Sequence, residues 1–143
     1  MELEILSQEW ADAWKDALNA SPAYRAAAAS WEGAVVAAVR AQAERRIGQR
    51  ALFLDLWHGS CRAARPAADA DFATARYVLT ASAATWTELL NGALDPVAAV
   101  TGGRLELTKG SVLGLFPHLA AAKELVAVAR CLGGVPPPEW GAT

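Results

Sequence analysis

The chain has 143 residues and a net charge of −2 at pH 7; 54% of its residues are hydrophobic and 20% are charged. A chain of this size and composition can form one globular domain with its own core, which excludes intrinsic disorder. Acidic and basic residues are spread along the chain, so no basic block predicts contact with nucleic acid, and no apolar run approaches the length of a membrane span.

Cysteine usage and the first residues indicate the cellular compartment. The chain has two cysteines, Cys61 and Cys131, and neither has the spacing of a zinc site. We therefore expect free thiols and neither a metal nor another cofactor. The first ten residues, MELEILSQEW, are acidic and lack the apolar core of a signal peptide, so the predicted location is the cytoplasm.

The N-terminal segment is predicted to be helical. Residues 3–20 carry apolar side chains at helical spacing, with acidic residues elsewhere around the helix. Ser21 is a favourable N-cap and Pro22 suits the first helical position. A second, short helix should therefore follow and run to about Ser30.

The middle of the chain changes to the pattern of strands. Apolar and β-branched residues predict strands at 31–41, 51–57 and 72–81. The polar stretch 42–50 should be a hairpin loop, and the stretch 58–71, which contains glycine, proline and small polar residues, should be a second loop. The three strands would then follow one another as a meander.

Two capping signals predict helices after this meander. Ser82 can cap a helix that carries Trp86 and ends at Gly92, because glycine accepts the backbone conformation that terminates a helix. Asp95 followed by Pro96 is a second start signal, with an N-cap residue directly before proline at the first helical position. We therefore expect two consecutive short helices.

The last quarter of the chain is predicted to hold one more strand and one more helix. Residues 104–110 alternate between polar and apolar side chains, which is typical of a half-buried strand. A short turn, interrupted by Pro117, leads into a helix over 117–132, and the Pro/Gly-rich tail 133–143 should lie on the surface without regular structure. The order α-α-β-β-β-α-α-β-α predicts an α+β domain over 1–132, with a mostly antiparallel sheet of about four to five strands covered by helices.

The segment 77–110, YVLTASAATWTELLNGALDPVAAVTGGRLELTKG, resembles the sterol carrier protein type-two family, the sterol-binding domain of lipid-transfer proteins. The family pattern is a strand, an aromatic-containing helix ending in LL-x-G, a helix starting D/N-P-x-x-A, and G-x-L-x-(I/L)-x-G. The stretch FLDLWHG at 53–59 is similar to the second strand of the family, and the element order agrees over about 31–130. The matching residues in 77–110 are Trp86, Leu89, Leu90, Gly92, Asp95, Pro96, Ala99, Gly103, Leu105, Leu107 and Gly110.

This resemblance implies a non-enzymatic protein, like the bacterial single-domain members, that binds and transfers an apolar ligand. The ligand would be a fatty acid, a fatty acyl-CoA or a sterol-like molecule in a tunnel between sheet and helices, and transient contact with a membrane surface is left open. Such binding needs only an apolar cavity with few polar groups. For each residue expected near the cavity, ordinary core packing is the competing interpretation. These residues are Trp86, Leu89, Leu90, Val97, Val100, Leu113, Leu115, Phe116, Leu119 and Val126.

A polar cluster at 55–61 raises the alternative of a small hydrolase or acyl-transfer enzyme. Asp55, His58, Ser60 and Cys61 are residue types of nucleophilic catalysis, but strand alternation places Asp55 and His58 on opposite faces. Ser60 also lacks the G-x-S-x-G context of a nucleophile elbow. We therefore expect no catalytic residue here, and Arg76 on the next predicted strand is the expected partner of Asp55.

A third interpretation is a protein-interaction module that binds no ligand. Four arginines could offer a cationic surface to an acidic partner or headgroup, although scattered arginines are usually only solvated. They are Arg62, Arg65, Arg76 and Arg104.

Overall fold

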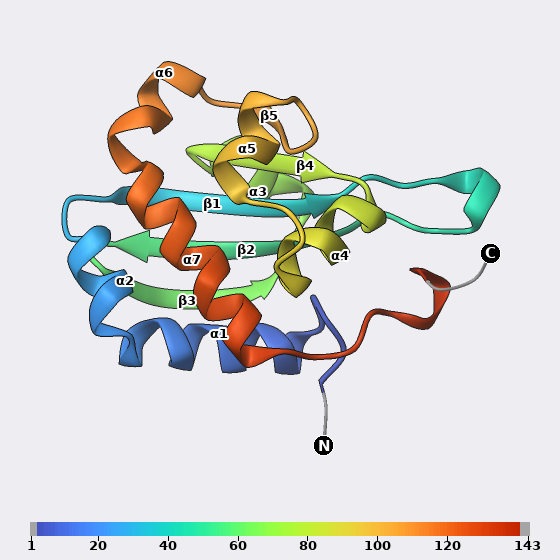
Figure 1. Ribbon diagram of the computed structural model, residues 1–143, viewed down its shortest axis with the longest axis horizontal. Coiled ribbons are helices and arrows are strands. Elements are labelled where there is room, and N and C mark those ends of the chain that lie inside the picture. The colour runs from blue at the N-terminus through green and yellow to red at the C-terminus, as the bar shows by residue number, and fades with distance from the viewer. Residues whose placement is uncertain (1–2, 141–143) are drawn as a thin grey trace.

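A five-stranded sheet forms the centre of the computed structural model, which describes residues 3–140 of the chain (Figure 1). The strand order is β3-β2-β1-β4-β5, with β1 and β4 parallel and the other neighbours antiparallel. The predicted α+β class with a mostly antiparallel sheet is confirmed. The strands are β1 (Glu32–Val39), β2 (Arg50–Trp57), β3 (Ser60–Pro66), β4 (Tyr77–Ala81) and β5 (Glu106–Lys109).

Most of the helices cover one face of this sheet. Helix α7 crosses the face diagonally, and α1 runs along the edge formed by β3 (Figure 1). Helix α3 (Asp69–Thr74) packs on the opposite face. The covering helices are α1 (Gln8–Ala20), α2 (Pro22–Ala27), α4 (Ala83–Asn91), α5 (Pro96–Thr101), α6 (Val112–Leu115) and α7 (Leu119–Leu132).

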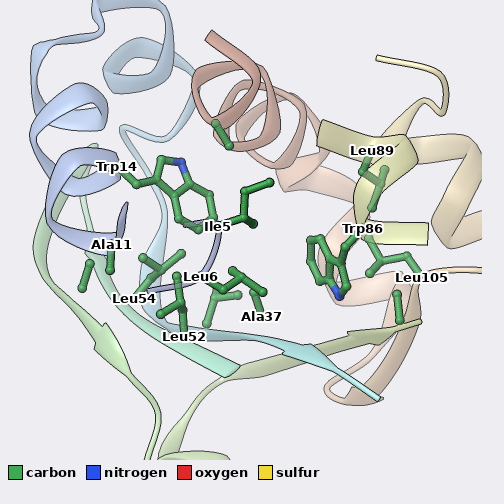
Figure 2. Close-up of a cluster of buried hydrophobic side chains, with 14 of the residues drawn as sticks. Ile5, Leu6, Ala11, Trp14, Ala37, Leu52, Leu54, Trp86, Leu89 and Leu105 are labelled. Carbon is green, nitrogen blue, oxygen red and sulfur yellow. The ribbon is translucent and has the colours of Figure 1, made fainter. Parts of the chain in front are cut away.

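The main hydrophobic core lies between the sheet and these helices (Figure 2). Leu52, Leu54 and Leu56 of β2 are buried on the helix side, whereas the alternate residues are less buried. Trp14 of α1 and Trp86 of α4 pack into the same core from two sides. The alternation expected for this strand is therefore confirmed.

The helix boundaries follow local capping chemistry. The Ser21 hydroxyl accepts a hydrogen bond from the Tyr24 amide, and the Asp95 carboxylate accepts one from the Ala98 amide. Ser82 caps α4 in the same way, and Gly92 follows that helix with a φ of 87°, which glycine adopts without strain. These predicted starts and stops are confirmed.

The expectation of a loop over 58–71 is wrong, because residues 60–66 form β3. His58 and Gly59 make a two-residue hairpin turn, with φ angles of 48° and 82°. A turn with positive φ at both positions matches the twist of an antiparallel pair, so the chain returns at once alongside β2. Pro66 ends the strand at the edge of the sheet, where no neighbour needs its missing amide hydrogen.

The predicted strand 72–81 is shorter than expected and begins at Tyr77. Its first residues belong to α3, and Phe72 and Ala75 pack with Val78 on the far face of the sheet. The α3 segment carries the chain back across that face, so β4 starts at the same end as β1 and pairs with it in parallel. This crossover is the one feature that breaks the expected meander.

Residues 133–140 of the predicted surface tail pack in part against the domain and contain a 3-10 turn, so the expectation of no regular structure is wrong for them; residues 141–143 lie outside the described residues. Val135 bridges to Glu4 in parallel, and Trp10 donates its indole N–H to the Gly133 carbonyl at 2.9 Å. Pro137 is fully buried and Trp140 is only 7% exposed. The residues after α7 therefore close the core beside the N-terminal segment.

Candidate functional site

Two adjoining apolar cavities lie between the sheet and α7. The larger has a volume of about 50 Å³ and is bordered by Trp86; the smaller, of about 30 Å³, is bordered by Trp31. We call them the Trp86 cavity and the Trp31 cavity. We call the two together the seam, because they adjoin and share five lining residues, which are Val35, Leu79, Leu115, Ala122 and Leu125.

Side chains from both layers line the Trp86 cavity. Strands contribute Val35, Ala37, Leu54 and Leu79 from the floor, and helices contribute the roof and walls. The remaining lining residues are Trp14, Trp86, Pro96, Val97, Val100, Leu105, Leu115, Leu119, Ala122, Leu125 and Val126. No charged side chain is among them, so the seam favours an apolar occupant.

The three tryptophans that border the seam have their indole N–H groups hydrogen-bonded to backbone carbonyls. The indole N–H of Trp86 donates to the Ala38 carbonyl at 2.9 Å, and that of Trp31 donates to the Gly33 carbonyl at 2.8 Å. Trp14 donates in the same way to the Leu125 carbonyl at 3.2 Å. Because these N–H groups are already hydrogen-bonded to the backbone, the rings contribute apolar surface to the seam and need no polar group from a ligand.

The ten residues predicted to lie near a ligand divide into six that line the seam and four that do not. Of these four, Leu89 is fully buried in the core, and Leu90 borders a separate depression with Ile5 and Thr87. Leu113 and Phe116 are 77% and 48% exposed. Ligand contact by any of the ten stays a prediction. The six that line the seam are Trp86, Val97, Val100, Leu115, Leu119 and Val126.

Sequence reasoning missed the walls of the Trp31 cavity. Tyr24 comes from α2, Trp31 directly precedes β1, and Tyr77 opens β4. The Trp31 and Tyr77 rings lie 5.3 Å apart because β4 begins beside the first half of β1, where Tyr77 pairs with Val35. The face shared by Leu54 and Leu56 was visible in the alternation, but this aromatic grouping depends on long-range pairing.

The polar cluster at 55–61 does not assemble a nucleophile. Asp55 pairs with Arg62 at 2.9 Å, so the expected partner Arg76 is wrong; Arg62 lies on β3, the strand that sequence patterning does not predict. His58 pairs with Glu32 at 2.5 Å. Within residues 3–140, no serine or cysteine hydrogen-bonds to His58.

Cys61 is a structural thiol. It is buried, its Sγ donates to the Ala63 carbonyl at 3.4 Å, and its backbone is held by the Asn19 side-chain amide. Burial raises the pKa of this thiol to about 11. A thiol with a raised pKa stays protonated, and therefore poorly nucleophilic, at neutral pH.

Alkylation should distinguish the two cysteines. At pH 8 we expect iodoacetamide to modify exposed Cys131 at least about a hundredfold faster than buried Cys61, because the thiolate is the reactive form. Peptide mass spectrometry over a time course measures both rates in one sample. Comparable rates would show that Cys61 is accessible and ionised, and would reopen the catalytic interpretation.

Most of the candidate cationic surface is neutralised by ion pairs. Three of the four arginines considered above are bonded to carboxylates, and the Arg65 guanidinium together with the Ala68 amide lowers the pKa of Asp71. Arg76 is the exception. The pairs are Arg62 with Asp55, Arg65 with Asp71, and Arg104 with Glu88.

Among residues 3–140, no group of three histidine, cysteine, aspartate or glutamate side chains is arranged to hold a metal ion. No helix in this part of the chain is long and apolar enough to cross a membrane.

Comparisons with known proteins agree with this architecture. The model of the SCP-2 sterol transfer family matches residues 14–112. A crystal structure of sterol carrier protein 2 is 44% identical, with a TM-score of 0.81 over 89% of this chain and 98% of its own. A solution structure of a conserved hypothetical protein from Thermus thermophilus, described as possibly sterol carrier protein, is 42% identical, with a TM-score of 0.80 over 94% of each chain.

A more distant structure supports the fold alone. Sterol Carrier Protein 2 from Yarrowia lipolytica, in its apo form, is 19% identical and has a TM-score of 0.57 over 83% of this chain and 88% of its own. A search of curated proteins gives no match.

Proposed function

This chain belongs to the SCP-2 sterol transfer family, and we propose that it binds one apolar, lipid-like ligand in the seam formed by the Trp86 and Trp31 cavities. The observation that carries the proposal is the adjacency of the two cavities, which share five lining residues, have no charged lining, and are bordered by tryptophans whose indole N–H groups are already paired. Apolar surface gains about 25 cal/mol per Å² on leaving water. Binding therefore requires no catalytic group, and the proposed role is non-catalytic.

A ligand needs more room than the seam offers in this conformation. The two cavities measure about 50 and 30 Å³, whereas ligand sites usually measure about 300–1,000 Å³. The segment over the shared wall is short and irregular: α6 has four residues, and Phe116–His118 form a single 3-10 turn at Pro117. We propose that this cover moves outward with Leu115 when a ligand enters.

Ligand binding should be detectable directly. We expect a fluorescent fatty acid to bind at micromolar concentration and an unlabelled fatty acid to displace it, because the seam is apolar. Native mass spectrometry after gentle purification should also retain a co-purified lipid. The absence of both a retained lipid and displacement at micromolar ligand would refute the carrier function.

We extend the proposal to transient contact with membrane surfaces. Leu113 and Phe116 are exposed on the cover, beside the shared wall residue Leu115, so both could enter the headgroup region of a bilayer. We expect co-sedimentation with lipid vesicles to decrease in a Leu113→Glu/Phe116→Glu variant whose fold is intact. Equal sedimentation of the variant and the parent would contradict this contact.

A cytoplasmic bacterial carrier is the setting that we propose. The 42% identical structure from Thermus thermophilus supports a bacterial context. A fatty acid is the proposed ligand class, since the narrow seam suits a single flexible chain.

A further inference from the structure

Two aromatic rings form part of the wall of the Trp31 cavity, and a third packs against one of them. Trp31 and Tyr77 line the Trp31 cavity, and their ring centroids lie 5.3 Å apart. The His118 ring meets Trp31 edge to face, with 4.7 Å between centroids. This wall stands where β1 and β4 begin, below the junction of α6 and α7 (Figure 1).

Arg76 reaches this wall because Gly33 has no side chain. A Cβ atom on Gly33 would lie 2.8 Å from Cδ and 3.0 Å from Cβ of Arg76, so the aliphatic stem of the arginine lies directly over the glycine. Gly33 has a φ of +130°, which also disfavours other residues. The guanidinium carbon then lies 5.5 Å from the Trp31 ring centroid and 5.4 Å from that of Tyr77.

The charge of Arg76 has no carboxylate partner. Within residues 3–140 the only hydrogen bond of its guanidinium runs from Nη1 to the Glu32 carbonyl oxygen at 2.7 Å, and the guanidinium takes part in no ion pair. The Glu32 carboxylate is bonded to His58 instead. The guanidinium thus keeps free donors on the surface, while the rings that it contacts border an apolar cavity.

We propose that Arg76 binds the anionic headgroup of a ligand whose apolar chain occupies the seam. This inference rests on the proposed function. A planar guanidinium with several free N–H donors suits a carboxylate or a phosphate, and both are bound more strongly by charge-assisted hydrogen bonds than a neutral hydroxyl is. The ligand is therefore an acidic amphiphile, and Gly33 is the residue that lets the cation reach its site.

Calorimetric titration with three amphiphiles of one chain length tests the assignment. Dodecanoate and dodecyl phosphate carry the two anionic headgroups, and dodecanol is the neutral reference. We expect the parent protein to bind at least one of the anions about tenfold or more tightly than the alcohol, as a charge-assisted hydrogen bond would provide. The preferred anion then distinguishes a fatty acid from a phosphate-bearing lipid.

Substitutions separate the headgroup from the chain. Arg76→Gln should reduce the ratio of the affinity for the anion to the affinity for dodecanol to about one, while leaving the Kd for dodecanol unchanged. Arg76→Lys should retain part of the preference for the anion. Arg40→Gln is the matched control, because Arg40 is exposed and pairs with Glu106, away from the seam. Thermal melting confirms that each variant is folded, and Arg76→Met, which also removes the charge, serves if Arg76→Gln does not fold.

The outcomes distinguish the two proposals. Equal binding of acid, phosphate and alcohol by the parent would overturn the headgroup site but leave the apolar carrier in place. An anion preference that survives in a folded Arg76 variant without the positive charge would overturn the role of Arg76. Failure of all three amphiphiles to bind would refute the proposed function itself.

Discussion

Replacing Ala122 by phenylalanine is expected to weaken ligand binding strongly while leaving the fold intact. Ala122 lies on α7 and lines both cavities, so a benzyl side chain at this position would occupy space in the cavities beside their shared wall. The residue is only half-buried, which allows the new ring some room to adjust. We expect the affinity for a fluorescent fatty acid to fall by at least about tenfold and the unfolding free energy by about 1–3 kcal/mol.

The matched control is Ala120→Phe on the same helix. Ala120 is exposed, so its substitution adds the same aromatic surface without entering the seam. Displacement titrations of the parent and both variants, made alongside urea unfolding, separate loss of the site from loss of the fold. Parent-like affinity in a folded Ala122→Phe variant would place the ligand elsewhere.

Local chemistry explains why much of the fold could be predicted from the sequence. Ser21 with Pro22, and Asp95 with Pro96, each combine a side-chain cap with a proline whose missing N–H is not needed at that position. The alternating burial along β2 can likewise be predicted from the order of neighbouring residues in the strand. Signals of this kind involve only a few neighbouring residues, so they can be recognised in the sequence without knowledge of the tertiary structure.

The missed elements depend on contacts between distant segments. β3 buries mainly the small residues Cys61 and Ala64, so it lacks the large apolar alternation of a typical strand, and it is stabilised by β2 and α1. The aromatic wall of the Trp31 cavity depends on contacts between still more distant segments, because Trp31 and Tyr77 become neighbours only through the parallel pairing of β1 and β4. Six of the ten predicted ligand residues line the seam because helical stripes face the sheet, whereas Leu113 and Phe116 fall on the outer side of a short, irregular cover.

Among the substitutions considered, replacing Gly110 by alanine should lower the unfolding free energy most. It should also disturb the wall of the Trp31 cavity. Gly110 has a φ of +97°, and an added Cβ would lie 2.3 Å from Cδ1 of Tyr77 and 3.1 Å from the Arg76 carbonyl oxygen. The backbone strain costs about 1–3 kcal/mol, and displacement of a packed ring adds a similar amount. We expect urea unfolding to show a loss of about 3–5 kcal/mol.

Gly103→Ala isolates the strain from the clash. Gly103 has a similar φ of +79°, but a Cβ there would meet nothing within 4 Å, so its substitution should cost only about 1–2 kcal/mol. If the clash with Tyr77 is the extra cost, Tyr77→Leu should be less harmful in the Gly110→Ala background than in the parent, which a double-mutant cycle measures. Additive effects would assign the whole loss to the backbone. A combined loss of stability smaller than the sum of the two single losses would instead show that Gly110 is required for the Tyr77 ring to pack against Trp31 and border the seam.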